Sequence, residues 1–310
     1  MHPATIYPPD RLVIREVGLR DGLQLVKTFP STGAKTRWLA IAHDAGLRHF
    51  EVGSYLPPSS APQFADVDAM VAATKALPGA FASVLALNLR GVESALAGAA
   101  DEIICVVSAT EEHSLANTRR SREDSLNGVR EAVALRDEND RKPLISAGIA
   151  MSLGCSIAGP VPVAEVLRIA ERCIDAGADV LCIADTVGYG GPRQVRELVA
   201  ALRPIAGAVP LSFHFHDTRG LGLANAAAAL DAGVRILDAS LGGLGGCPFA
   251  PGATGNIVLE DVIFLAQTMG FDVPVDLDRL VEARRVLAET MPEETLYGGI
   301  ARAGLPYQPA

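Results

Sequence analysis

The sequence predicts an α/β fold, a (β/α)8 TIM barrel with a C-terminal helical extension. Eight short apolar runs alternate with longer segments of helical period, a repeat typical of this barrel. Aromatic residues make up 5%, while Ala, Gly, Val and Leu are plentiful, which favours close packing of helices on a sheet. A doubly wound sheet is the structural rival, but the chain has no early GxGxxG turn. No low-complexity linker interrupts the pattern, so we expect one domain over residues 1–310.

The eight predicted strands are short runs rich in Val, Ile, Leu and Phe. They cover residues 11–18, 49–53, 81–87, 102–108, 144–151, 180–186, 211–217 and 236–242. Together with their helices they place the barrel at about residues 11–270 and the extension at 271–310.

The predicted helices show apolar residues at helical spacing. The clearest cover residues 31–46, 160–178, 191–205, 220–234 and 256–270, with a further one at 276–290 in the extension. Three helices end in an Ala-Gly pair, at 45–46, 176–177 and 232–233. Glycine tolerates the positive φ that is common just past a helix, so these pairs predict helix ends.

Composition and charge exclude several classes of function. The formal net charge of −9 is spread along the chain without a long run of Lys or Arg, which disfavours nucleic acid and anionic membranes as main partners. We find no signal peptide and no apolar run of about 18 residues. Five cysteines without CxxC spacing favour reduced thiols and a cytoplasmic location over a disulfide framework. Four of them, Cys105, Cys155, Cys173 and Cys182, lie in apolar or helical surroundings that predict buried, inert thiols.

Polar residues gather where the predicted strands end, which is the catalytic face of a barrel. They are Arg20, Asp21 and Gln24 after the first strand, Glu51 in the second, Asp185 and Thr186 in the sixth, and His214 and His216 in the seventh.

The stretch "FHFHDT" (213–218) predicts a metal site. Residues two apart on a strand share a face, so His214 and His216 project together. Phe213 and Phe215 point the other way. Two imidazoles with oxygen ligands and no thiolate suit Mg²⁺ or Mn²⁺ better than structural zinc. Asp21 and Asn256 are the candidate oxygen ligands, although Asn256 can also be the N-cap of the helix at 256–270.

The remaining polar candidates each have two interpretations. Arg20 can form a surface ion pair with Asp21, or it can pair with Glu51, whose burial without a partner would be costly. Asp185 can accept backbone N–H bonds as a structural carboxylate, or it can transfer protons. The glycine-rich segment 242–255 is either a connector or a lid that brings Cys247 to the site as an acid or base.

Three motifs resemble the 3-hydroxy-3-methylglutaryl-CoA lyase family of the DRE-TIM metallolyase superfamily. They are "EVGLRDGLQ" (16–24), "HFHDTRGLGLANAAAAL" (214–230) and "GLGGCPFAPGATGN" (243–256). The resemblance runs from about residue 12 to 270, and related Claisen-type synthases lack the cysteine loop. It implies cleavage of 3-hydroxy-3-methylglutaryl-CoA, or a close analogue, to acetyl-CoA and a 3-oxo acid such as acetoacetate. The alternatives are a different 3-hydroxy-3-alkylglutaryl or citramalyl thioester, a Claisen-type synthase, and a catalytically silent barrel that binds CoA thioesters.

The resemblance also implies roles for individual residues. A divalent cation, Mg²⁺ or Mn²⁺, would be bound by Asp21, His214, His216 and Asn256. Arg20 would stabilise the enolate, Glu51 would hold Arg20, Asp185 would transfer protons, Cys247 would close on the substrate, and Gln24 and Thr186 would contact it. The family further implies an acyl-CoA partner and a homodimer or larger homo-oligomer. The chain departs from the family pattern at Leu25-Val26, at "LPPSSAPQ" (56–63) and at "GCSIAG" (154–159), which leaves the acyl group open.

Overall fold

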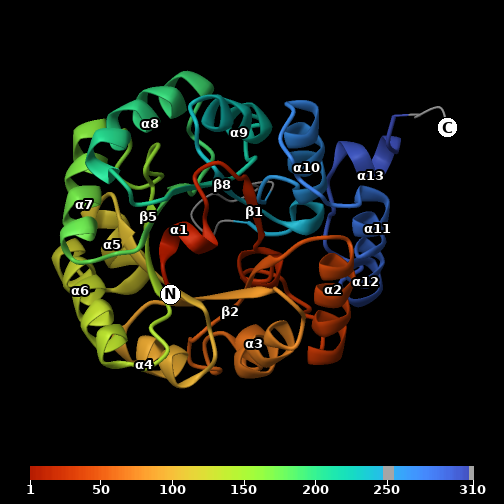
Figure 1. Ribbon diagram of the computed structural model, residues 1–310, viewed down its shortest axis with the longest axis horizontal. Coiled ribbons are helices and arrows are strands. Elements are labelled where there is room, and N and C mark those ends of the chain that lie inside the picture. Colours follow the sequence, from red (N-terminus) through yellow and green to blue (C-terminus); the bar gives the residue numbers. More distant parts are fainter. Residues whose placement is uncertain (247–254, 307–310) are drawn as a thin grey trace.

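Eight parallel strands form a closed barrel in sequence order, so the predicted fold is confirmed (Figure 1). The computed structural model describes residues 1–246 and 255–306. The strands are β1 (Val13–Glu16), β2 (His49–Ser54), β3 (Phe81–Ala86), β4 (Glu102–Ser108), β5 (Leu144–Ala150), β6 (Val180–Asp185), β7 (Leu211–Phe215) and β8 (Ile236–Ala239). Each lies within one predicted run except β2, which ends one residue later, at Ser54. Strand β8 closes the barrel by pairing with β1.

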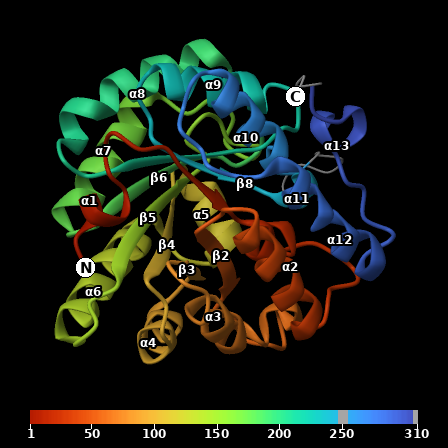
Figure 2. The same ribbon diagram turned by 45° about the vertical axis from the view of Figure 1, so that its right-hand side comes forward.

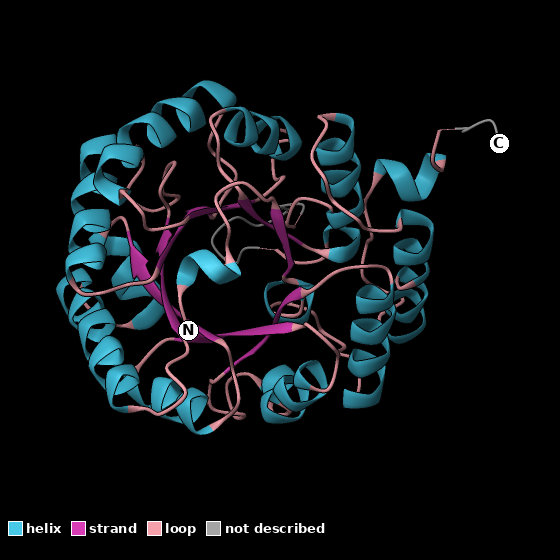
Figure 3. Ribbon diagram, in the orientation of Figure 1, coloured by secondary structure: helices cyan, strands magenta, loops and turns pink. Residues whose placement is uncertain are grey.

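Helices surround the barrel as an outer ring (Figure 3). The ring consists of α2 (Thr32–Asp44), α3 (Val67–Lys75), α4 (Leu89–Ala97), α5 (Glu111–Thr118), α6 (Arg122–Glu138), α7 (Val163–Asp175), α8 (Pro192–Ala206), α9 (Gly222–Asp231) and α10 (Leu259–Thr268). In the described part of the chain, no helix has the length and apolar character needed to span a membrane.

The C-terminal extension packs on the outside of the ring beside α2 and α10 (Figures 1 and 2). It contains α11 (Leu277–Glu282), α12 (Arg284–Thr290) and α13 (Gly299–Ala303). The helix predicted at 276–290 is therefore two helices. At Ala283 the helical hydrogen-bond pattern is interrupted, while the backbone stays helical, with φ of −61° and ψ of −25°.

The predicted Ala-Gly helix ends are confirmed. Gly46, Gly177 and Gly233 follow α2, α7 and α9 with φ of 117°, 93° and 90°. At Gly46 a Cβ atom would also lie 2.3 Å from the Pro274 carbonyl oxygen, so the extension packs against a position that only glycine fits.

Alternation along the strands stacks the inward-facing side chains in layers. The layer at the N-terminal end is apolar and is covered by the short helix α1 (Pro3–Ile6). It contains Tyr7, Val13, Phe81, Leu144, Val180 and Ile236. This layer fills the N-terminal end of the barrel.

The next layer is polar and is centred on Arg15, which is 1% exposed. Its Nε donates to Asp238 Oδ1 at 2.6 Å and its Nη1 donates to Glu102 Oε1 at 3.1 Å. Glu102 also accepts hydrogen bonds from Tyr7 and Ser146. The buried charges are thus paired and hydrogen-bonded, as burial requires.

Candidate active site

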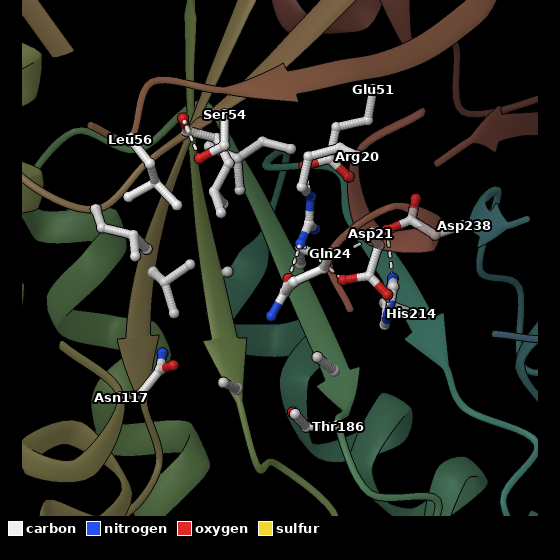
Figure 4. A pocket seen from close by; sticks show the side chains of 18 of the residues that line it. Arg20, Asp21, Gln24, Glu51, Ser54, Leu56, Asn117, Thr186, His214 and Asp238 are labelled. Atoms are coloured by element: carbon white, nitrogen blue, oxygen red, sulfur yellow. Dashed lines mark hydrogen bonds and ion pairs between the residues drawn. The ribbon is translucent and has the colours of Figure 1, made fainter. Parts of the chain in front are cut away.

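Above the polar layer lies a cavity of about 340 Å³ at the C-terminal face of the barrel (Figure 4). Seven of the predicted site residues line it: Arg20, Asp21, Gln24, Glu51, Thr186, His214 and His216. Asn256 and Asp185 are not among the lining residues. Cys247 and most of the predicted lid lie outside the described residues.

A π-helical turn, Gly18–Gly22, turns the chain after β1 and directs Arg20 and Asp21 into the cavity. The backbone N–H groups of residues 20, 21 and 22 all converge on the Val17 carbonyl oxygen, at 3.1, 2.7 and 3.3 Å. A Cβ atom at Gly18 would lie 2.5 Å from Glu16 Oε1 and 2.6 Å from the Trp38 ring, so only glycine fits at the start of the turn. Such π-turns are frequent at functional sites.

Arg20 is held by three acceptors around one edge of the cavity. Its Nε donates to Glu51 Oε1 at 2.7 Å, and its Nη1 donates to Asp21 Oδ1 at 2.7 Å and to Gln24 Oε1 at 3.2 Å. The sequence left two pairings open, and the structure contains both. The Arg20–Asp21 pair is not on the surface, because the two side chains are only 12% and 11% exposed. Burial raises the pKa of Glu51 and the Arg20 charge opposes that rise.

Asp21 also lies beside both histidines of β7. Its Oδ2 is 3.5 Å from His216 Nε2 and 3.9 Å from His214 Nε2. The ligand atoms of these three residues all lie within 4.8 Å of one another. Burial would raise the pKa of Asp21, but Arg20 and the two imidazoles hold that pKa well below its usual range. The Phe213 and Phe215 rings stack on the other side of β7 with centroids 5.6 Å apart, so the predicted alternation is confirmed: the phenylalanines pack and the histidines face the cavity.

Asn256 joins this cluster from the loop before α10. Its Nδ2 donates to Asp21 Oδ2 at 2.8 Å, and its backbone forms an isolated bridge with His216. The N-cap interpretation of Asn256 is wrong, because the helix begins later and Val258 is its N-cap. Asn256 Oδ1 and His216 Nδ1 are buried and, among the described residues, have no hydrogen-bond partner. Unpaired buried acceptors beside a carboxylate and two imidazoles form a donor set that fits a divalent cation.

Asp238 is a site residue that the sequence did not reveal. Its Oδ2 lies 3.3 Å from His214 Nδ1, while Arg15 donates to both of its oxygens, at 2.6 and 3.1 Å. An ionised carboxylate only accepts hydrogen bonds, so His214 Nδ1 is the donor to Asp238, and His214 Nε2 faces Asp21. The available signal was a carboxylate inside the apolar run 236–242, at a position that pairs in register with His214.

Asp185 holds a turn rather than facing the cavity. Its two carboxylate oxygens accept the N–H groups of Tyr189 at 2.8 Å and Gly190 at 3.0 Å, and burial raises its pKa. This geometry favours the structural interpretation of Asp185, and its proton-transfer role stays a prediction. Thr186 lines the cavity, where its hydroxyl oxygen accepts the Met151 N–H at 2.8 Å. The four cysteines in the described part of the chain are free and buried, as predicted.

Comparison with known proteins assigns the family. A family model described as HMGL-like matches residues 11–287, which is most of the chain. The chain belongs to the HMGL-like family. The hydroxymethylglutaryl-CoA lyase YngG of Bacillus subtilis is 33% identical over 283 residues, covering 91% of this chain and 94% of that protein. The human mitochondrial hydroxymethylglutaryl-CoA lyase is 32% identical over 287 residues, covering 93% and 88%. The predicted family and the predicted class, a carbon–carbon lyase, are confirmed.

Solved structures of this family superpose closely on the barrel. The hydroxymethylglutaryl-CoA lyase of Pseudomonas aeruginosa matches with a TM-score of 0.89 at 33% identity, covering 95% of this chain and 97% of that one. An HMG-CoA lyase from Acinetobacter baumannii, solved in complex with coenzyme A and 3-methylmalate, matches with a TM-score of 0.88 at 34% identity, covering 97% and 99%.

Proposed function

We propose that this HMGL-like protein is a divalent-metal-dependent lyase that cleaves 3-hydroxy-3-methylglutaryl-CoA, or a close 3-hydroxyacyl-CoA analogue, to acetyl-CoA and a 3-oxo acid. One observation carries the proposal: Arg20, Asp21, His214 and His216 converge on one cavity at the catalytic face of the barrel. The names of the relatives support the substrate, and the coenzyme A bound to the Acinetobacter protein supports a thioester.

The metal ligands would be Asp21, His214, His216 and Asn256. The absence of thiolates from this set favours Mg²⁺ or Mn²⁺. When bound, the cation would supply Lewis-acid polarisation that acidifies the tertiary hydroxyl of the substrate.

The cleavage step defines what the protein must stabilise. The C2–C3 bond of the thioester breaks, the hydroxyl on C3 loses its proton and becomes a carbonyl, and the electron pair stays on C2 as the enolate of acetyl-CoA. Protonation of C2 completes acetyl-CoA. Negative charge therefore grows on the thioester oxygen, and a fixed cationic donor near that oxygen lowers the barrier.

Arg20 is placed to be that donor. Its described hydrogen bonds use Nε and Nη1, which leaves Nη2 for the substrate. Glu51 fixes the guanidinium by the bond to Nε, so little reorganisation is needed when the enolate forms. Gln24 and Thr186 line the same cavity and are our candidates for substrate contact. We keep Asp185 and Cys247 as predicted proton-transfer residues, to be tested by substitution.

The test is acetyl-CoA release from a set of 3-hydroxy-3-alkylglutaryl-CoA and citramalyl-CoA thioesters with Mg²⁺ or Mn²⁺. His214→Ala should lose both bound metal and cleavage. His43→Ala is the matched control, because His43 is a buried histidine whose Nε2 contacts the Pro78 carbonyl oxygen and does not line the cavity. If His214→Ala keeps its metal content and its activity, the metal assignment is wrong. If no thioester is cleaved, the lyase proposal is wrong and a silent CoA-binding barrel replaces it.

We further propose a cytoplasmic location and a homodimer or larger homo-oligomer. The free, buried thiols support a reducing compartment. Light scattering on the purified protein tests the assembly, and a monomeric mass would contradict it.

A further inference from the structure

The cavity has an apolar side that the proposed chemistry does not use. Polar residues in or directly after β2, β7 and β8 surround Arg20 and Asp21, whereas β3 and β4 contribute only aliphatic side chains to the lining. Those side chains are Leu85, Ile104 and Val106, and Leu87, directly after β3, joins them. Figure 4 shows the two sides well separated, with Arg20, Asp21 and His214 together and Leu56 and Asn117 across the cavity from them.

Small residues on β5 and β6 create the space between the two sides. These strands contribute Gly148, Ala150 and Ala184 where β3 and β4 carry leucine, isoleucine and valine. Because inward positions of a barrel are otherwise filled by branched side chains, three small residues in adjacent strands leave a hollow.

Gly148 is not required by the backbone of β5. Its φ is not positive, unlike that of the many glycines that end helices or turns. A Cβ atom there would lie 3.7 Å from both Ile104 Cγ2 and the Cys105 carbonyl oxygen, which is ordinary van der Waals contact. Glycine inside a strand is unfavourable and often marks a place where a ligand approaches closely. What Gly148 provides is therefore room in the cavity.

The apolar side offers no cationic side chain to bind a charged group. Among the described residues that line the cavity, Arg20 is the one arginine or lysine, and it lies on the polar side. His113, at the aliphatic side, has its pKa lowered to about 4 by burial, so it is neutral at pH 7. A carboxylate placed there would lose its hydration without gaining a cationic partner. This side therefore favours an apolar occupant.

We propose that the apolar side of the cavity binds the alkyl group on C3 of the thioester and accepts chains longer than methyl, with Gly148 limiting their length. This inference rests on the proposed lyase function. The chemistry at C2 and C3 stays beside Arg20 and Asp21, and the alkyl chain extends from C3 toward Ile104 and Gly148. The substrate class is thus 3-hydroxy-3-alkylglutaryl-CoA, which is cleaved to acetyl-CoA and a 3-oxo acid that keeps the alkyl group.

The experiment compares kcat/KM for the propyl and methyl thioesters. One methylene in a hydrophobic pocket is worth about tenfold or more in kcat/KM, so the wild-type propyl-to-methyl ratio should be at least about one. Gly148→Val fills the hollow with an isopropyl group and should lower this ratio by about tenfold or more. Ile104→Ala widens the same hollow and should raise the ratio, so the two variants move specificity in opposite directions.

The matched control is Gly33→Ala, an exposed glycine in α2 that has only Ser31 Oγ near an added Cβ atom, at 4.0 Å. It should leave the ratio unchanged. Cleavage of the methyl thioester alone, or the same ratio in wild type, Gly148→Val and Ile104→Ala, would overturn the alkyl pocket and leave the lyase function standing. If Gly148→Val does not fold, Gly148→Ala and Ile104→Ala decide by the same ratio. Absence of cleavage for every thioester would overturn both proposals.

Discussion

Replacing Asp238 by Asn tests whether the barrel interior tunes the metal site. The substitution keeps the volume of the side chain but removes the charge that Arg15 contacts through two hydrogen bonds, at 2.6 and 3.1 Å. Burial raises the pKa of Asp238, but the interactions with Arg15 and His214 together outweigh burial and lower this pKa to about 2. A decrease of that size from 3.8 corresponds to about 2 kcal/mol. Breaking a buried ion pair costs about 3–5 kcal/mol. We therefore expect Asp238→Asn to lower the free energy of unfolding by about 2–5 kcal/mol.

The effect on the metal should be separate from the effect on stability. Asp238 accepts the proton of His214 Nδ1, and loss of such an outer partner lowers metal affinity by about 10–100-fold. Titration calorimetry with Mn²⁺ on folded, metal-free protein measures the affinity, and urea unfolding measures the stability. Asp101→Asn is the matched control, because Asp101 is also buried and charge-paired, with Lys75, but does not line the cavity. It should lose stability and keep its Mn²⁺ affinity. A folded Asp238→Asn protein that binds Mn²⁺ within about twofold of wild type would refute the reasoning.

Three further predictions concern buried carboxylates. Glu51→Gln removes the charge that fixes Arg20 Nε, so kcat should fall by about 100-fold with a smaller change in KM. Acetyl-CoA release measures both constants, and an unchanged kcat would contradict the role of Glu51. Asp185→Asn leaves one buried N–H of residues 189–190 unpaired, so the protein should lose about 1–3 kcal/mol in urea unfolding while kcat changes less than about tenfold. A large loss of kcat at unchanged stability would instead establish proton transfer by Asp185. Burial raises the pKa of Glu16 from 4.5 to about 8, with Glu260 adding to the rise. The stability that protonated Glu16 contributes is therefore complete below pH 4.5 and is lost as pH rises through about 8. Between pH 4.5 and about 8, the free energy of unfolding should therefore fall less in Glu16→Gln than in wild type, by up to about 5 kcal/mol. Equal slopes of this free energy against pH, measured by urea unfolding, would contradict this.

The sequence predicted the barrel well because its signals are local. Each strand is a short apolar run, and each Ala-Gly pair needs a positive φ just past a helix, so neither depends on distant contacts. The same holds for "FHFH", where alternation within one strand separates the residues that pack from those that face the cavity. The extension was predicted less well, since no glycine or proline marks the interruption at Ala283 and the helical period continues through it.

The parts of the site that the sequence missed depend on barrel closure. Arg15 and Asp238 are 223 positions apart and meet because β1 pairs with β8. Asn256 was predicted as a ligand only beside an N-cap alternative, because its place depends on a bridge to His216 across a loop without regular structure. A local pattern contains no information on such pairings.

The layering of the barrel separates the parts that hold the chemistry from the part that selects the substrate. Asp238 connects the buried Arg15 to His214, so the predicted metal ligands are held by a buried polar network. Substitutions in such a network are strongly destabilising because they leave a buried charge unpaired. The aliphatic residues around Ile104 and Gly148 can contact an occupant of the cavity only by van der Waals interactions. A change of side-chain volume there costs less free energy than an unpaired buried charge does. Substitutions at β3 to β6 can therefore alter the alkyl chain that fits while Arg20 and the histidines keep their positions. It follows that a change of substrate in this barrel needs no change in its predicted metal ligands, and that motifs taken from those residues alone identify the reaction without identifying the acyl group.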